Sequence, residues 1–217
     1  MNNVFLLSEG KLSSAASGST KWLRIVAQGN FFLQAFGRER GIDWNHYYNP
    51  VLSFGAVTAT ATFAVPATVQ KISQNEDDVL RITHTDGQYT DYTFVPHDQL
   101  KKYSTGNYVA RIGANIKFNE AFTADSPQFG GTITCPVYAY PATFEDDSDV
   151  IDHPDSNWLV LAVAADRVKN DVTRKDLRAD LSNQANELMQ ALKEDNEGQI
   201  SEVTRTWTPV TTEVWYL

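Results

Sequence analysis

The residues best suited to chemistry in this 217-residue chain are four histidines, one cysteine and a run of carboxylates. The histidines are His46, His84, His97 and His153, and none repeats at the spacing of metal ligands. His84 and Asp86 lie on one face of an expected strand, but no candidate nucleophile accompanies them. The sequence also lacks a nucleophile elbow and a phosphate-binding glycine loop. We therefore predict a protein that is not an enzyme and has no catalytic residues.

Carboxylates are concentrated in residues 145–155, just ahead of an expected helix. They are numerous enough for a divalent cation, but they lack the glycine-centred, alternating spacing of a calcium loop. A solvated acidic loop is the favoured interpretation. Cys135 lies in a strand-like run before Pro136, which favours a small buried hydrophobe over a reactive thiol. We predict no metal and no cofactor.

Two groups of aromatic residues are candidates for binding. Trp44, Tyr47 and Tyr48 could stack on a base or a sugar, although packing in a core or between subunits is favoured because no basic residue lies beside them. The second group is at the C-terminal end, where chains are normally polar. Packing on its own domain and docking on a partner are both open, and alternating Thr, Val and Glu suits strand addition. The partner-docking candidates are Trp207, Val210, Val214, Trp215, Tyr216 and Leu217.

Composition limits the class of protein. The formal charge of −9 argues against a protein that grips phosphates, because such proteins use Lys and Arg for that purpose. A hydrophobic content of 42% is sufficient for a core. No apolar stretch is long enough for a membrane span, and the first residues lack a signal-peptide pattern. We expect a soluble protein that is made in the cytoplasm and has no membrane partner.

The elements that must position these residues begin with a helix. Ser19 or Thr20 caps it, and its apolar residues repeat at helical spacing until a stop signal at Gly41. Residues 57–65 alternate strictly and predict a half-buried strand. Further strands are expected at 68–72, 79–83, 89–95, 108–118 and 132–138. Asp86 and Gly87 form the strongest hairpin signal.

A helix pair at 155–196 closes the folded part. Residues 158–165 are apolar on every face, which predicts a buried helix. Residues 174–196 carry one apolar stripe and one polar side, which predicts a surface helix. The stripe consists of Leu177, Leu181, Ala185, Leu188 and Leu192. The side chains expected to contact neighbouring subunits are Arg178, Asn183, Glu187, Gln190 and Glu194.

These elements predict an α+β fold. The N-terminal helix and the C-terminal pair would form a small helical bundle, with an antiparallel β-sandwich or barrel-like insertion between them. The expected divisions are residues 1–41 for a lead-in and helix, 42–144 for the β-rich insertion, 145–196 for the acidic loop and helix pair, and 197–217 for an extended C-terminal arm.

Four segments of the sequence resemble those of a known protein family. They are the N-terminal helix closing on residues 41–44, the strand and its exit at 58–72, the β run ending at 138–141, and residues 155–160 with the helix that ends near Asn196. In order and spacing they resemble the head-to-tail adaptor proteins of tailed bacteriophages, also called connector or head-completion proteins. This chain differs from the shortest members in its large β insertion and its aromatic tail.

The resemblance implies a virion structural protein at the neck, the junction of head and tail. Its copies would form a ring, commonly a dodecamer, that binds below the portal protein and extends the DNA channel toward a downstream tail or neck protein. The DNA would pass without sequence-specific binding, which suits an acidic chain. Two alternatives stay open. One is a tail-tube terminator or other neck protein, and the other is a carbohydrate-binding β module that uses Trp44, Tyr47 and Tyr48.

Overall fold

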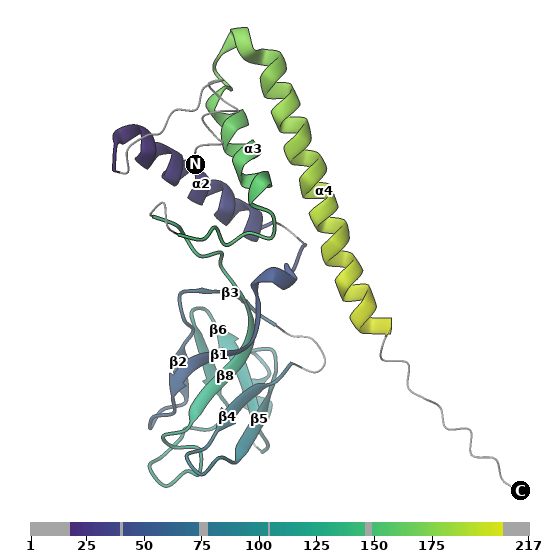
Figure 1. Ribbon diagram of the computed structural model, residues 1–217. Coiled ribbons are helices and arrows are strands. Elements are labelled where there is room, and N and C mark those ends of the chain that lie inside the picture. The colour runs from purple at the N-terminus through teal and green to yellow at the C-terminus, as the bar shows by residue number, and fades with distance from the viewer. Residues whose placement is uncertain (1–17, 40, 74–77, 104, 146–148, 206–217) are drawn as a thin grey trace, which may run out of the picture. The chain divides into compact units, whose positions relative to one another are not determined.

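Figure 1 shows the computed structural model, which describes residues 18–39, 41–73, 78–103, 105–145 and 149–205, with the backbone alone for 199–205. The fold is α+β, as predicted, with α-helices and a curled mixed sheet. The chain divides into two compact units. We call the first the helical unit (residues up to 46 and from 141 onward) and the second the β unit (residues 47–140).

Helix α2 (Thr20–Gly37) is the first element of the helical unit. The Ser19 side chain caps it by accepting a hydrogen bond from the Trp22 N–H at 3.3 Å, as expected for an N-cap serine. The helix ends at Gly37, earlier than the stop predicted at Gly41. Gly41, with φ +79°, instead belongs to the following turn, which the Ile42 N–H closes onto the Glu39 carbonyl.

Helix α3 (Ser156–Arg167) is the buried helix that the sequence predicts. The Asp155 side chain caps it by accepting from the Asn157 N–H at 2.8 Å. Most of its apolar residues are buried, and only Val160 and Ala162 are half-buried. This burial follows from its neighbours, because α3 packs against both α2 and α4.

Helix α4 (Lys175–Arg205) lies beside α3 and forms a hairpin with it (Figure 1). A short 3-10 turn, η3 (Val172–Arg174), precedes it, and the Asp171 side chain caps that turn. Helix α4 also continues past Asn196, so the extended arm predicted from residue 197 is wrong for 197–205. No proline interrupts this stretch to end the helix.

The β unit contains the strands of the mixed sheet. Their bounds are β1 (Tyr48–Ala56), β2 (Thr62–Ala64), β3 (Val69–Ile72), β4 (Leu80–Thr83), β5 (Tyr89–Phe94), β6 (Tyr108–Ile112), β7 (Asn115–Phe118) and β8 (Thr132–Ala139). The order is β1-β8-β4-β5-β6-β7-β2, and β3 also pairs with β8. Two short 3-10 turns are η1 (Asn45–Tyr47), at the boundary of the units, and η2 (Leu100–Lys102).

The predicted hairpin at Asp86 and Gly87 is confirmed, because β4 and β5 pair antiparallel and Gly87 has φ +85°. The single strand predicted at 108–118 is instead two strands, β6 and β7, which turn at Gly113 with φ +60°. The sheet is not wholly antiparallel as expected, because β5 and β6 run parallel, with Thr93 opposite Tyr108.

The strand predicted at 57–65 is mostly wrong, because only β2 forms there. The Thr60 N–H donates to the Thr58 carbonyl, and the Thr62 N–H donates to the Thr60 hydroxyl. These local hydrogen bonds take the place of hydrogen bonds to a neighbouring strand. Strand β1, just before it, was not predicted. Its register against β8 shifts between Asn49 and Leu52 and again near Gly55, and such irregularities break the two-residue alternation that marks a strand.

The β unit has its own apolar core. Its fully buried side chains include Leu80, Ile82, Val109, Ile116, Ile133, Cys135 and Val137. Cys135 is buried, as predicted for a small hydrophobe, and this burial raises the pKa of its thiol to about 12. A thiol in this state is a poor nucleophile at neutral pH. None of the described helices is both long enough and apolar enough to cross a bilayer.

Candidate functional site

The residues suited to catalysis or metal binding do not come together in the described structure. His84 Nε2 lies 2.8 Å from the Thr90 hydroxyl, whereas Asp86 accepts from the Gln88 N–H, so no His–Asp pair forms. Among the described residues, no group of three His, Cys, Asp or Glu side chains is placed to hold a metal ion. Residues 146–148 of the acidic loop lie outside this description.

The aromatic candidates are placed for packing. Trp44 is buried, stacks on Phe36 with ring centroids 4.1 Å apart, and donates its indole N–H to the Phe36 carbonyl at 3.0 Å. Tyr47 is buried as well, and Tyr48 is half-buried with its hydroxyl donating to Asp78. A base or sugar needs an exposed ring face to stack on, and Trp44 and Tyr47 offer none.

His153 lies in the aromatic cluster that holds α3 in place. Its ring stacks on Trp158 at 5.0 Å and lies 4.1 Å from Phe36, and its Nδ1 accepts from the Asp155 N–H at 3.0 Å. Its Nε2 is buried with no hydrogen-bonding partner in the described structure. Burial lowers the pKa of His153 to about 4, so the ring is neutral at pH 7. The ring is packed in the core of the helical unit.

Four of the five residues predicted to contact neighbouring subunits share one exposed face of α4. Asn183, Glu187, Gln190 and Glu194 are all exposed, and their spacing of four, three and four places them on one side of a helix. The Gln190 side chain donates to Glu194 at 3.0 Å. Two further exposed carboxylates, Asp176 and Asp180, lie on the same side. We call Asp176, Asp180, Asn183, Glu187, Gln190 and Glu194 the acidic face of α4.

Arg178, the fifth predicted contact residue, lies on a different side of α4. Its Nη1 atom is 3.5 Å from the Lys169 carbonyl oxygen, at the end of α3. Ala185, two turns farther along the same side of the helix, is buried. The structure therefore separates Arg178 from the acidic face and places it in a groove.

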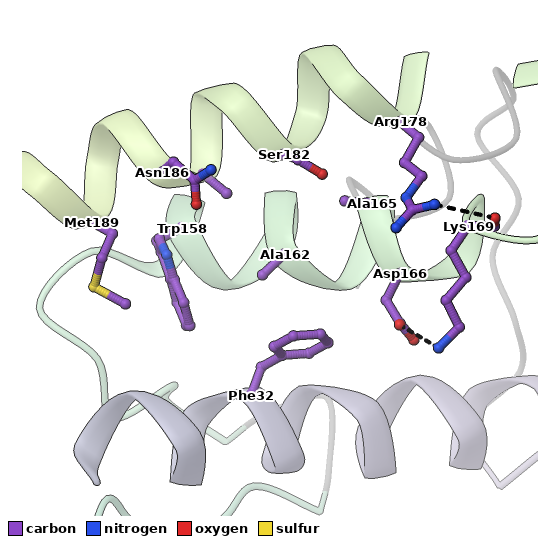
Figure 2. Close-up of a pocket in the computed structure, with 11 residues that line it drawn as sticks. Phe32, Trp158, Ala162, Ala165, Asp166, Lys169, Arg178, Ser182, Asn186 and Met189 are labelled. Atoms are coloured by element: carbon purple, nitrogen blue, oxygen red, sulfur yellow. Dashed lines mark hydrogen bonds and ion pairs between the residues drawn. The ribbon is translucent and has the colours of Figure 1, made fainter. Parts of the chain in front are cut away.

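That groove lies between α2, α3 and α4 and has a volume of about 290 Å³ (Figure 2). Phe32 enters it from α2, Trp158 and Ala162 come from α3, and Met189 comes from α4. Its polar end holds Lys169, Asp166 and Arg178, where the Lys169 ammonium pairs with the Asp166 carboxylate at 2.6 Å.

A second hollow of about 470 Å³ shares Asp166 and Lys169 with this polar end. Its other charged lining residues are Arg24 of α2 and Arg167 of α3. We call the two hollows together the basic groove, because their linings contain Arg24, Arg167, Lys169 and Arg178 against the one carboxylate of Asp166. Sequence reasoning missed it, because three separate segments supply the cations.

The outer side of α2 carries exposed apolar side chains beside this groove. Leu23 is 53% exposed and Phe31 is 69% exposed, and they lie four residues to either side of Ala27, which lines the groove. We call Leu23, Ala27 and Phe31 the outer stripe of α2. The four-residue spacing was visible in the sequence, but the more numerous apolar residues of the core side obscured it.

No protein-family model matches this chain, and no curated protein matches its sequence.

Proposed function

We propose that this protein is a virion structural protein, a head-to-tail adaptor whose copies form a ring below the portal and extend the DNA channel toward the tail. The proposal rests on the observation that α4 is a long helix, packed on one side and exposed along the other. The four segments that resemble adaptor proteins support it from the sequence. On this proposal the protein assembles and does not catalyse.

Helix α4 extends well beyond the helix that packs against it. Its 31 residues make a helix about 46 Å long, whereas the 12 residues of α3 span about 18 Å, so α3 covers less than half of it. Nearer its end, the Asn196 side chain accepts from the Asn45 N–H at 2.9 Å and donates to the Asp43 carbonyl at 3.1 Å. These contacts fix the inner side of α4 and leave its acidic face for other copies.

The charge of the chain is consistent with a conduit for DNA. A ring that passes a duplex should not bind its phosphates strongly, because each phosphate contact to Lys or Arg adds affinity. A chain of formal charge −9 meets this requirement. In this proposal α2, α3 and α4 form the small helical bundle of the adaptor, the sheet is its β insertion, and residues 207–217, outside the described structure, are the portal-docking arm.

The first test removes the arm. A chain that ends after Arg205 keeps all of α4, and we expect it to fold, as measured by circular dichroism, but to lose binding to the portal protein encoded in the same genome. A full-length variant with Trp207→Ser, Trp215→Ser and Tyr216→Ser is the matched control for chain length, and we expect the same loss. Mass photometry and negative-stain images with and without portal are the measurements.

Two results would contradict the proposal. Equal portal binding by the shortened chain would exclude the arm as the docking segment. A full-length chain that forms no ring either alone or on the portal would exclude the adaptor function. Binding to tail-tube rings in place of the portal would favour the alternative of a tail-tube terminator or other neck protein. The carbohydrate module is not favoured, because Trp44 and Tyr47 are buried.

A further inference from the structure

We propose that the basic groove and the outer stripe of α2 in one copy bind the acidic face of α4 in the next copy. The proposal names the two surfaces through which copies of this chain meet, and it rests on the proposed function in expecting that such contacts close into a ring.

The acidic face carries a line of carboxylates along α4. Asp180, Glu187 and Glu194 are seven residues apart, so they follow one line along the helix at intervals of about 10 Å. Amides occupy the positions between them at Asn183 and Gln190. All five side chains are exposed.

The cations among residues 175–198 of α4, whose side chains the structure describes, do not neutralise this line. Arg178 is turned toward Lys169. Lys193 is turned toward Glu39, with which it pairs at 3.1 Å. Lys175 lies five residues before Asp180, and this spacing places the two side chains on different sides of the helix. The acidic face therefore offers carboxylates to whatever packs against it.

The basic groove has the opposite charge. Asp166, its one carboxylate, already accepts hydrogen bonds from the Lys169 ammonium at 2.6 Å and from the Gln28 amide at 2.8 Å. The guanidinium groups of Arg24 and Arg178 add positive charge beyond this pair. In a chain of formal charge −9, such a local excess of cations favours an acidic partner surface.

The outer stripe supplies the apolar part of the contact. Leu23 and Phe31 expose more than half of their side chains beside the groove, and burying them would stabilise an interface by the hydrophobic effect. Across the contact, Ala179 and Ala191 are exposed on α4 at the margins of the acidic face. Small side chains there would let the two helices approach closely.

The occupant is another copy and not the same chain, for a geometric reason. The groove is lined by the inner side of α4, through Ser182, Ala185 and Met189, whereas the acidic face lies on the opposite side of that helix. A copy cannot fill its own groove with its own acidic face. Two different surfaces on opposite sides of one helix give a heterologous contact, which repeats from copy to copy and closes when the rotation permits.

The experiment reverses the charge of each surface separately. The groove variant is Arg24→Glu with Arg178→Glu, and the face variant is Glu187→Lys with Glu194→Lys. We expect each variant alone to self-associate about tenfold more weakly or worse, because like charges then meet. Mixed together, the two variants restore opposite charges at every contact, and we expect them to co-assemble in alternation at close to the wild-type concentration.

The matched control is Lys101→Glu with Lys102→Glu, which makes the same charge change as the groove variant at exposed residues of the β unit. We expect it to assemble as the wild type does. Assembly is measured by mass photometry over a concentration series, alone and on the portal, and circular dichroism establishes that each variant is folded.

Several outcomes would overturn this inference. One is wild-type assembly by either variant alone. Another is a mixture of folded variants that stays monomeric while the wild type assembles. The proposed function fails separately: a wild-type chain that self-associates through these surfaces but does not bind the portal would contradict the adaptor function and leave this contact intact.

Discussion

The His153 side chain lies in an environment that is very different from water. It is buried between aromatic rings, its Nε2 has no hydrogen-bonding partner in the described structure, and its pKa is lowered to about 4. The neighbouring titratable groups are Asp155, Asp152 and His46, and burial outweighs them. Protonating this ring in the folded protein would place a charge in the core.

This environment predicts a pH-dependent stability. The unfolded chain takes up a proton near the ordinary pKa of about 6.5, whereas the folded chain does so near 4. The free energy of unfolding is therefore undiminished by His153 above pH 6.5. It decreases as the pH falls from 6.5 toward 4, because the unfolded chain then binds the proton and the folded chain does not. We expect His153 to account for a loss of about 2 kcal/mol between pH 7.5 and 5. Urea unfolding at the two pH values measures it.

The matched variants for this prediction are His153→Phe and His97→Gln. The phenylalanine preserves a stacked ring without a titrating group, so its stability should fall less between the two pH values. His97 is exposed, and its replacement should leave the wild-type pH dependence unchanged. An equal pH dependence in His153→Phe and wild type would show that another group is responsible.

Among the elements, α2 and α4 each contain a glycine, and the two sites differ in a measurable way. At Gly29 an added Cβ would lie 2.6 Å from Phe144 Cζ, whereas at Gly198 nothing lies within 4 Å. Alanine removes the helix cost of glycine, about 1 kcal/mol, at both sites. We expect Gly198→Ala to stabilise the protein by up to about that amount. At Gly29 overpacking costs about 1–3 kcal/mol, so Gly29→Ala should be destabilising on balance.

Thermal unfolding followed by circular dichroism compares the two glycine variants, and each serves as the control for the other. A stabilising Gly29→Ala would mean that the Phe144 ring moves aside at little cost. Glycine inside a helix is unfavourable, and the close packing of Phe144 on the Gly29 backbone gives a reason for it there. Phe144 itself could not be named from the sequence, since it is 115 residues away.

The sequence predicted elements well where one periodicity persisted. The hairpin at Asp86 and Gly87 and the pair α3 and α4 have uninterrupted patterns, and both formed as expected. Strand β1 was missed because register shifts break its alternation. The end of α4 was missed because aromatic residues after Arg205 suggested an extended arm beginning at residue 197. The basic groove could not be predicted from the sequence, because Arg24 and Arg167 line the same hollow only when α2 packs on α3.

At the scale of the whole molecule, the helical unit and the β unit each have a core. Ile82 is fully buried in the β unit and Leu33 is fully buried in the helical unit. Replacing either by alanine should cost about 2–5 kcal/mol through the lost contacts and the cavity. We expect Ile82→Ala to increase hydrogen exchange more in the β unit, and Leu33→Ala more in the helical unit. Equal increases throughout the chain would show that the two units unfold as one.

The thiol of Cys135 can report how often the β unit opens. The sequence contains one cysteine, and it lies fully buried in that unit, so a thiol reagent can modify the native chain only during an opening that exposes it. With enough reagent the labelling rate becomes the opening rate, without mutation or an attached probe. Comparing that rate between free chains and assembled ones would report whether assembly tightens a unit that supplies neither of the proposed contact surfaces.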